Sequence, residues 1–195
     1  MIAAVALVVL AYELGTFPTG MLVAQKQGHD LLDEGSGNPG ASNVYRVAGF
    51  KAGAVVLIGD LVKGVLAASG GLLVGDRELA LVCGLAVVIG HCFPVQRWGR
   101  GGKGVAAAGG MALVLFPIMI AALGVLWFLI ARVLNKASRG SLGVVVASPI
   151  GVAAMQRPGT EVALVSAVCV LVIARHHSNI RRLLKGEESS LRSPA

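Results

Sequence analysis

The sequence predicts an all-α protein, a polytopic bundle of about seven membrane-spanning helices. Of its 195 residues, 55% are hydrophobic and only 14% are charged, whereas about a quarter of a soluble domain is charged. The apolar residues form long runs separated by short polar stretches, and the 27 glycines suit close helix packing in a membrane. We therefore expect a single integral membrane domain over residues 1–195, without an internal repeat.

The first apolar run covers residues 1–24, and we expect it to be retained as a span. Its start lacks the basic region of a signal peptide, and no small-residue cleavage site follows. Proline cannot continue a helix, so this span should kink near Pro18. A carboxylate in lipid is costly, so Glu13 should face the bundle interior as a structural hydrogen-bond partner.

Two further spans follow in the first half of the chain. A polar loop over residues 25–46 precedes the second span, residues 47–75, and the third span covers residues 79–94. In the second span, Asp60 and Lys63 are three residues apart and therefore share a helical face. We expect them to form an inward-facing pair.

The second half begins with another polar loop, residues 97–104. Residues 105–115 are apolar but reach only about half of the roughly 20 residues that a full span needs. The chain should then turn at Pro117 and continue as a helix over residues 118–133. Merging these two helices would reduce the count of spans from seven to six.

A third polar loop, residues 135–141, leads to the last two spans. These are expected at residues 142–155 and 160–174, and a polar tail begins at Arg175.

The distribution of positive charge predicts the orientation. With seven spans, 14 of the 17 Lys and Arg residues lie on one side of the membrane. They are Lys26, Arg46, Lys51, Arg97, Arg100, Lys103, Arg132, Lys136, Arg139, Arg175, Arg181, Arg182, Lys185 and Arg192. Basic loops stay in the cytoplasm, so the N-terminus is expected outside and the C-terminus in the cytoplasm. A six-span count would split this charge, so the asymmetry favours seven.

The polar loops therefore converge on one face, and the first of them has the chemistry of an anion site. Residues 35–46 carry three glycines within six residues, so successive backbone N–H groups can form an anion-binding nest. Ser36 and Asn43 add neutral hydrogen-bonding groups, and Arg46 adds a planar cation that suits phosphate.

The other polar segments add groups of the same kind. Lys103 comes from the second loop, Arg139 and Ser141 come from the third, and His176 and Asn179 share a helical face in the tail. Three cations with glycine backbone and hydroxyl groups suit two phosphates, or a phosphate and a developing oxyanion. Taken singly, Arg139, Ser141 and His176 are ordinary structural residues; their convergence is what indicates function.

Several other functions are excluded. The GxGxxG string at residues 35–40 follows no strand, so it is not a dinucleotide site, and the glycine loop around Lys103 is not a P-loop. No Ser-His-Asp arrangement and no metal-ligand spacing is evident, so we expect no cofactor and no metal. The net charge of +7 comes from residues that flank apolar runs, so orientation and anionic substrates explain it better than nucleic acid. Cys83, Cys92 and Cys169 are expected to be buried thiols.

Three motifs together resemble the bacterial acyl-phosphate:glycerol-3-phosphate acyltransferases. They are GSGNPGASNVYR at residues 35–46, GHCFP with GRGGKGVAAAGG at residues 90–110, and HHSNIRRLLKGEE at residues 176–188. Their order and spacing match the family across nearly the whole chain.

The resemblance implies a seven-helix enzyme of the bacterial inner membrane with its active site facing the cytoplasm. Such enzymes transfer a fatty acyl group from acyl phosphate to the 1-hydroxyl of glycerol 3-phosphate, giving lysophosphatidic acid and inorganic phosphate in the first step of phospholipid synthesis. The implied partners are acyl phosphate, glycerol 3-phosphate and membrane lipid, with a functional link to an acyl-phosphate-forming enzyme. In this family a substrate phosphate is thought to take the hydroxyl proton.

The resemblance also assigns site residues. The essential positions of the family fall on Ser36, Arg46, Lys103, Ser141, His176 and Asn179. The surrounding loop residues are expected to bind substrate phosphate: Gly35, Gly37, Asn38, Gly40, Asn43, Gly101, Gly102, Gly104 and Arg139. The alternative function is a membrane transporter of phosphate or organophosphate anions. A transporter needs a polar route through the membrane midplane, whereas the polar loops of this chain converge on one face. A non-catalytic scaffold would leave the converging glycine loops unexplained.

Overall fold

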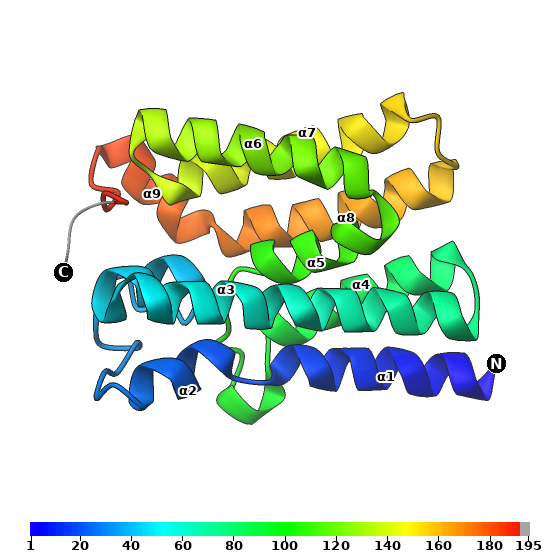
Figure 1. Ribbon diagram of the computed structural model, residues 1–195, viewed down its shortest axis with the longest axis horizontal. Helices are drawn as coiled ribbons and strands as arrows, with labels where there is room; N and C mark the ends of the chain where they lie inside the picture. The colour runs from blue at the N-terminus through cyan, green and yellow to red at the C-terminus, as the bar shows by residue number, and fades with distance from the viewer. Residues whose placement is uncertain (192–195) are drawn as a thin grey trace.

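The computed structural model describes residues 1–191, and all regular structure in that range is helical (Figure 1). Arg192, one of the basic residues used to predict orientation, lies outside the described residues. The helices are α1 (Ile2–Thr16), α2 (Thr19–Gln25), α3 (Ala41–Val74), α4 (Arg77–Cys92), the 3₁₀ turn η1 (Val95–Arg97), α5 (Val105–Leu115), α6 (Pro117–Leu134), α7 (Ala137–Ala154), α8 (Gly159–Arg175) and α9 (His177–Lys185). The predicted all-α class is confirmed.

Proline and glycine set most of the helix boundaries. The chain breaks between α1 and α2 at Phe17 and Pro18, which confirms the predicted kink. It turns again between α5 and α6, where Pro117 occupies the first turn of α6 and needs no intrahelical N–H bond. Gly104, with φ of 83°, allows the sharp turn into α5.

Helix α3 is bent near its start. Gly49 has φ of 83° and ψ of 178°, a conformation that other residues rarely adopt. The bend separates a short segment that begins at Ala41 from the long apolar part of the helix. The first polar loop therefore ends six residues earlier than the predicted boundary at Arg46, so Asn43 and Arg46 lie on a helix.

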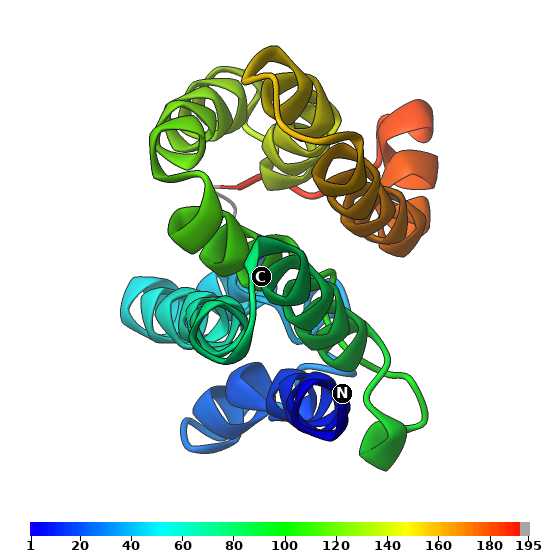
Figure 2. The same ribbon diagram turned by 90° about the vertical axis from the view of Figure 1, so that its right-hand side faces the viewer.

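The helices form two packed groups (Figures 1 and 2). In the first, α1 packs on α4, and α3 packs on α4 and α5. In the second, α7 packs against both α6 and α8. The groups meet where α8 contacts α4 and α6 contacts α5, and Leu81, Val88, Phe116 and Val172 are almost fully buried in the main hydrophobic core.

Five helical segments within residues 1–191 are long and apolar enough to span a membrane: Ile2–Gln25, Ala41–Val74, Arg77–Arg97, Pro117–Leu134 and Ala137–Ala154. The pair α8 and α9 passes the same test together but is bent by 55°. Helix α5 is apolar but short, as its sequence indicated. The count of seven spans stays a prediction.

Two expectations about polar residues are wrong. Residues 137–141 are not a loop: Asn135, in the left-handed conformation with φ of 49°, ends α6, and α7 begins two residues later. Glu13 does not face the bundle interior. Its side chain is exposed and accepts a hydrogen bond from Gln96 Nε2 at 3.0 Å, because η1 brings Gln96 beside the outer face of α1.

Candidate active site

A cavity of about 360 Å³ lies between the two groups of helices and is lined mainly by α3, α5, α6, α7 and α8, with one residue each from α4 and α9. The first residues of α3, α5 and α7 all line it, so three positive helix ends point toward the same space. Ten predicted site residues line the cavity: Ser36, Asn38, Gly40, Asn43, Arg46, Lys103, Gly104, Ser141, His176 and Asn179. Further along α5, α6 and α8 the lining becomes apolar. The cavity therefore has a polar end and an apolar body.

The first loop is held in place by Asn43. Its Oδ1 accepts a hydrogen bond from the Ser36 N–H at 2.8 Å, and its Nδ2 donates to the Glu34 carbonyl at 3.1 Å. Asn43 is 2% exposed, and both ends of its amide are in use. We infer that Asn43 shapes the loop that presents Ser36, while Gly35 supplies the turn with φ of 62° and does not line the cavity.

Hydrogen bonds of its backbone connect the second loop to α4 and α8. The Gly102 N–H donates to the His91 carbonyl at 3.0 Å. Arg175 donates from Nε to the Gly102 carbonyl at 3.2 Å and from Nη2 to the Gly101 carbonyl at 2.9 Å. Gly101 and Gly102 therefore do not line the main cavity, and the next residue, Lys103, projects into it.

This packing makes Gly102 intolerant of a side chain. A Cβ at Gly102 would overlap Nε2 of His91, which is buried and whose Nδ1 lies 3.6 Å from Asp60 Oδ1. Gly102→Ala should displace the loop by about 1 Å and lower kcat/KM by roughly 10²-fold, measured with the purified variant as formation of lysophosphatidic acid, the product that the family resemblance implies. Gly159→Ala is the control, because no atom of the described residues lies within 4 Å of the added Cβ. Equal activity in the two variants would contradict this role for the loop.

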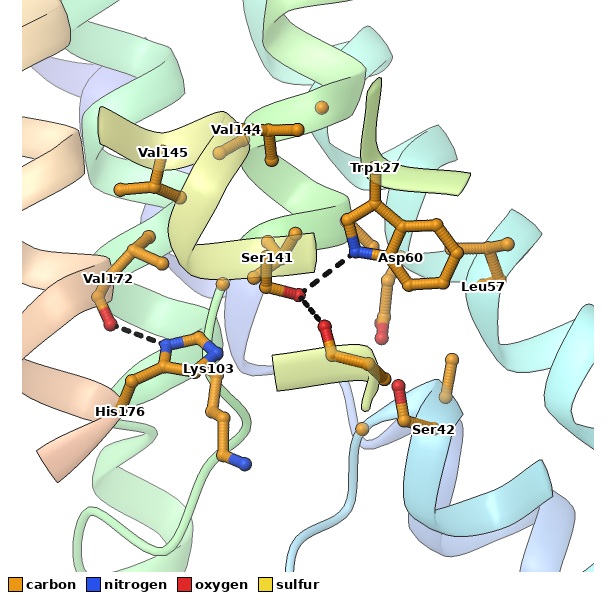
Figure 3. Close-up of a pocket in the computed structure, with 18 of the residues that line it drawn as sticks. Ser42, Leu57, Asp60, Lys103, Trp127, Ser141, Val144, Val145, Val172 and His176 are labelled. Atoms are coloured by element: carbon orange, nitrogen blue, oxygen red, sulfur yellow. Dashed lines mark hydrogen bonds between the residues drawn. The ribbon is translucent and has the colours of Figure 1, made fainter. Parts of the chain in front are cut away.

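Lys103 is the least satisfied cation of the site. Its side chain is partly buried, and its ammonium makes no hydrogen bond or ion pair within residues 1–191. Burial lowers the pKa of Lys103 to about 8; Glu188 opposes the shift, while Arg182, Arg46 and Arg175 add to it. Figure 3 shows the Lys103 side chain beside His176.

The lowered pKa predicts a pH dependence. A lysine with a pKa of about 8 is charged below that pH and loses its charge above it. If the ammonium binds phosphate, kcat/KM should fall as pH rises through about 8, since kcat/KM reports the free enzyme. Lys103→Arg keeps its charge to much higher pH, so any activity it retains should lack this alkaline limb. An identical limb in that variant would assign the titration to another group.

His176 and Asn179 present polar atoms to the cavity from the junction of α8 and α9. His176 Nδ1 lies 2.7 Å from the Val172 carbonyl, which only accepts, so Nδ1 carries the proton and Nε2 is left available (Figure 3). Asn179 Nδ2 donates to Glu188 Oε1 at 2.6 Å. Asn179 Oδ1 is buried without a partner within residues 1–191. Both side chains thus retain one acceptor for a ligand.

The polar residues of α7 lie on different faces of the helix, and only one face lines the cavity. Ser141 Oγ accepts a hydrogen bond from Trp127 Nε1 at 3.1 Å and donates to the Ala137 carbonyl at 3.1 Å (Figure 3). Ser138, three residues earlier on the same face, also lines the cavity. Arg139 points elsewhere: its side chain is exposed and does not line the cavity. Gly37, likewise expected to bind phosphate, borders a separate surface hollow.

Glu188 is a buried site residue for which the sequence suggested no role. It is 5% exposed, and it accepts hydrogen bonds from Asn179 Nδ2 and from Arg182 Nε at 2.8 Å. Burial alone would raise the pKa of Glu188, but these hydrogen bonds and the Arg182 charge hold it below its ordinary value. Its backbone carbonyl also accepts from Lys136 Nζ. The sequence feature that could have indicated this burial is Gly186, which ends α9 with φ of 75° and turns the tail back onto the bundle.

A second buried group adjoins the cavity from α3 and α4. Asp60 and Lys63 are paired at 2.7 Å and almost fully buried, which confirms the predicted inward-facing pair. Asp60 and His91 also line the cavity, which was not expected.

The three cysteines are buried free thiols, as predicted.

The polar end is therefore strongly cationic. Four cations lie close enough to interact electrostatically: Arg46, Lys103, Arg175 and Arg182. The negative charge of Glu188 opposes theirs. Within the described part of the chain, no group of three or more His, Cys, Asp or Glu side chains is placed to hold a metal ion. The arrangement suits a ligand with an anionic head and an apolar chain.

The chain is similar to known glycerol-3-phosphate acyltransferases over nearly its whole length. The family model described as glycerol-3-phosphate acyltransferase matches residues 5–186. The glycerol-3-phosphate acyltransferase of Syntrophotalea carbinolica is 41% identical over 187 residues, which cover 94% of this chain and 95% of that protein. The Geobacter sulfurreducens protein of the same name is 37% identical over 189 residues, covering 96% and 97% of the two chains.

Two solved structures share the fold. A crystal structure of PlsY (YgiH), an integral membrane glycerol 3-phosphate acyltransferase in its glycerol 3-phosphate form, matches with a TM-score of 0.91 and 34% identity. It covers 96% of this chain and 94% of the other. The lysophosphatidic acid form matches with a TM-score of 0.89 and 33% identity over the same shares of the two chains.

Proposed function

Because this chain belongs to the glycerol-3-phosphate acyltransferase family, we propose that it transfers a fatty acyl group from acyl phosphate to the 1-hydroxyl of glycerol 3-phosphate. It is an integral membrane acyltransferase of phospholipid synthesis, and the comparisons do not support the transporter alternative. Lysophosphatidic acid and inorganic phosphate are the products of the proposed reaction.

One observation carries the proposal: a single cavity joins a cationic end to an apolar body. An acyl phosphate has the same two parts, with its reactive carbonyl at their junction. Burial of the chain along α5, α6 and α8 stabilises the complex through the hydrophobic effect. The phosphate then lies where Lys103 and the first residues of α5 can meet it.

The roles of the site residues follow from the atoms they present. Lys103 and Ser36 hold the acyl phosphate and stabilise its departing charge, together with glycine N–H groups of the loops. Ser141, whose proton is donated to the Ala137 carbonyl, instead fixes the Trp127 indole at the cavity wall. Arg46 and Lys103 bind the phosphate of glycerol 3-phosphate. Asn179 Oδ1 is an acceptor, so it takes a glycerol hydroxyl rather than a phosphate oxygen. His176 Nε2 is also an acceptor, so it likewise takes a hydroxyl of glycerol 3-phosphate.

We propose direct transfer without an acyl-enzyme. The 1-hydroxyl oxygen attacks the acyl carbon, the bond from that carbon to the bridging phosphate oxygen breaks, and the hydroxyl proton passes to a substrate phosphate. Ser141 is poorly placed as a nucleophile, because its proton is donated to the Ala137 carbonyl. Among the described residues, no base is hydrogen-bonded to the hydroxyl of Ser36 or Ser141.

We further propose that the chain is one acyltransferase domain in the bacterial inner membrane, with the cavity's polar end facing the cytoplasm. The basic residues of the polar loops support this orientation. Glycerol 3-phosphate would then arrive from solution while the acyl phosphate arrives from the lipid. An acyl-phosphate-forming enzyme in the same cell would supply the donor.

The test is donor choice by the purified protein. With glycerol 3-phosphate as acceptor, palmitoyl phosphate should give lysophosphatidic acid, detected by mass spectrometry, and palmitoyl-CoA should give none. Turnover of palmitoyl-CoA alone would overturn the proposed donor while leaving the acceptor intact.

A further inference from the structure

The apolar body of the cavity ends at Phe116. This residue lines the cavity at the turn between α5 and α6 and is 1% exposed. On α8, the lining extends from His176 at the polar end to Val165, about three helical turns deeper. The cavity therefore has a measurable depth, with the aromatic ring of Phe116 at its far end.

Phe116 is held in place from behind by an ion cluster in which a buried carboxylate binds two partly exposed arginines. The Arg77 guanidinium carbon lies 5.2 Å from the ring centroid of Phe116, and Arg77 Nη2 donates to the Leu115 carbonyl at 3.1 Å. Arg77 Nε also donates to Glu161 at 3.0 Å, and Arg157 Nη2 reaches the same carboxylate at 2.7 Å. Glu161 is 3% exposed.

This cluster makes Phe116 a firm boundary. An alkyl chain that pushed past the ring would strip these charges of partners without replacing them, which is costly. The ring cannot easily turn aside either, because it is almost fully buried and stacked on Arg77, and Pro117 restricts the backbone beside it.

We propose that Phe116, backed by the Arg77–Glu161 ion pair, sets the longest acyl chain that the enzyme accepts. The inference rests on the proposed function, because it requires the acyl chain of the donor to occupy the apolar body of the cavity. A chain that fits ends against the ring; a longer chain lifts its acyl phosphate out of reach of Lys103.

The test is the chain-length profile of kcat/KM, measured with lauroyl, myristoyl, palmitoyl, stearoyl and arachidoyl phosphate. Phe116→Ala removes the boundary, and the ratio of kcat/KM for the longest to the shortest donor should rise by roughly tenfold or more, the discrimination that methylene groups produce in an apolar pocket. Phe116→Leu should move the profile in the same direction by less. Phe128→Ala is the matched control: Phe128 is 59% exposed on α6 and does not line the cavity.

A second variant tests the opposite direction. Cys169 lies about two turns below His176 and lines the cavity, so Cys169→Phe should shift the profile toward shorter donors. If Phe116→Ala does not fold, Phe116→Leu and Cys169→Phe still test whether Phe116 limits the length of the acyl chain. An unchanged profile in active variants would overturn the boundary and indicate that the chain leaves between α3 and α6. Failure of the wild type to use any acyl phosphate would instead overturn the proposed function.

Discussion

Lys103→Ala is expected to reduce lysophosphatidic acid formation by roughly 10²–10³-fold or more, the loss that follows removal of a single group that stabilises developing negative charge. Two cations of the described chain line the cavity at its polar end, Arg46 and Lys103. Arg46 already donates from Nε to the Ser190 carbonyl at 3.0 Å, whereas the Lys103 ammonium has no hydrogen-bond or ion-pair partner within residues 1–191. A partly buried charge without a protein partner is costly unless a ligand compensates it, so this arrangement indicates a ligand.

The experiment compares purified Lys103→Ala with wild type and with Lys26→Ala, an exposed lysine that does not line the cavity. Lys26→Ala should retain full activity. Lys103→Ala should insert and purify normally, because no described contact of its ammonium is lost. A folded Lys103→Ala protein with wild-type turnover would remove Lys103 from the site.

Glu188→Ala is expected to cost both stability and activity. The Glu188 carboxylate accepts from Asn179 at 2.6 Å and from Arg182 at 2.8 Å, and each donor left unsatisfied costs about 1–3 kcal/mol. Release of Asn179 should raise KM for glycerol 3-phosphate, because Asn179 then no longer holds its Oδ1 in the cavity. Kinetics with varied glycerol 3-phosphate and the temperature of inactivation measure the two effects separately.

The neighbouring Glu187 is the matched control, since it is exposed and has the same charge. Glu187→Ala should behave as wild type. Glu188→Gln keeps an acceptor for Asn179 and should recover part of the KM effect. If Glu188→Ala lowers thermal stability but leaves KM unchanged, then Glu188 only supports the fold and does not position Asn179.

The sequence was sufficient for features that depend on local chemistry. Pro18 and Pro117 marked the breaks in the helices because proline lacks an N–H donor. The glycine-rich loops and the spacing of Asp60 and Lys63 pointed to turns and to a shared face, and the structure has both. Lys103 followed from the same reasoning, because a cation on a glycine loop is a local feature.

The remaining features depend on how distant segments meet. Arg139 was assigned to the site as a loop residue, but on a helix it is rotated away from the face that Ser138 and Ser141 share. Glu188 looks like a solvated tail carboxylate until Gly186 turns the chain and buries it against Asn179. Trp127 became part of the site only because α6 packs on α7 and directs its indole N–H at Ser141.

The most direct test of acyl transfer at this cavity uses palmitoyl phosphate labelled with ¹⁸O at the bridging oxygen. The purified protein should release phosphate only when glycerol 3-phosphate is present, in a one-to-one ratio with lysophosphatidic acid, and the released phosphate should carry the label. That result would establish attack at the acyl carbon with phosphate as the leaving group. Phosphate release without the acceptor, or label left in the lipid, would contradict direct transfer from acyl phosphate to glycerol 3-phosphate.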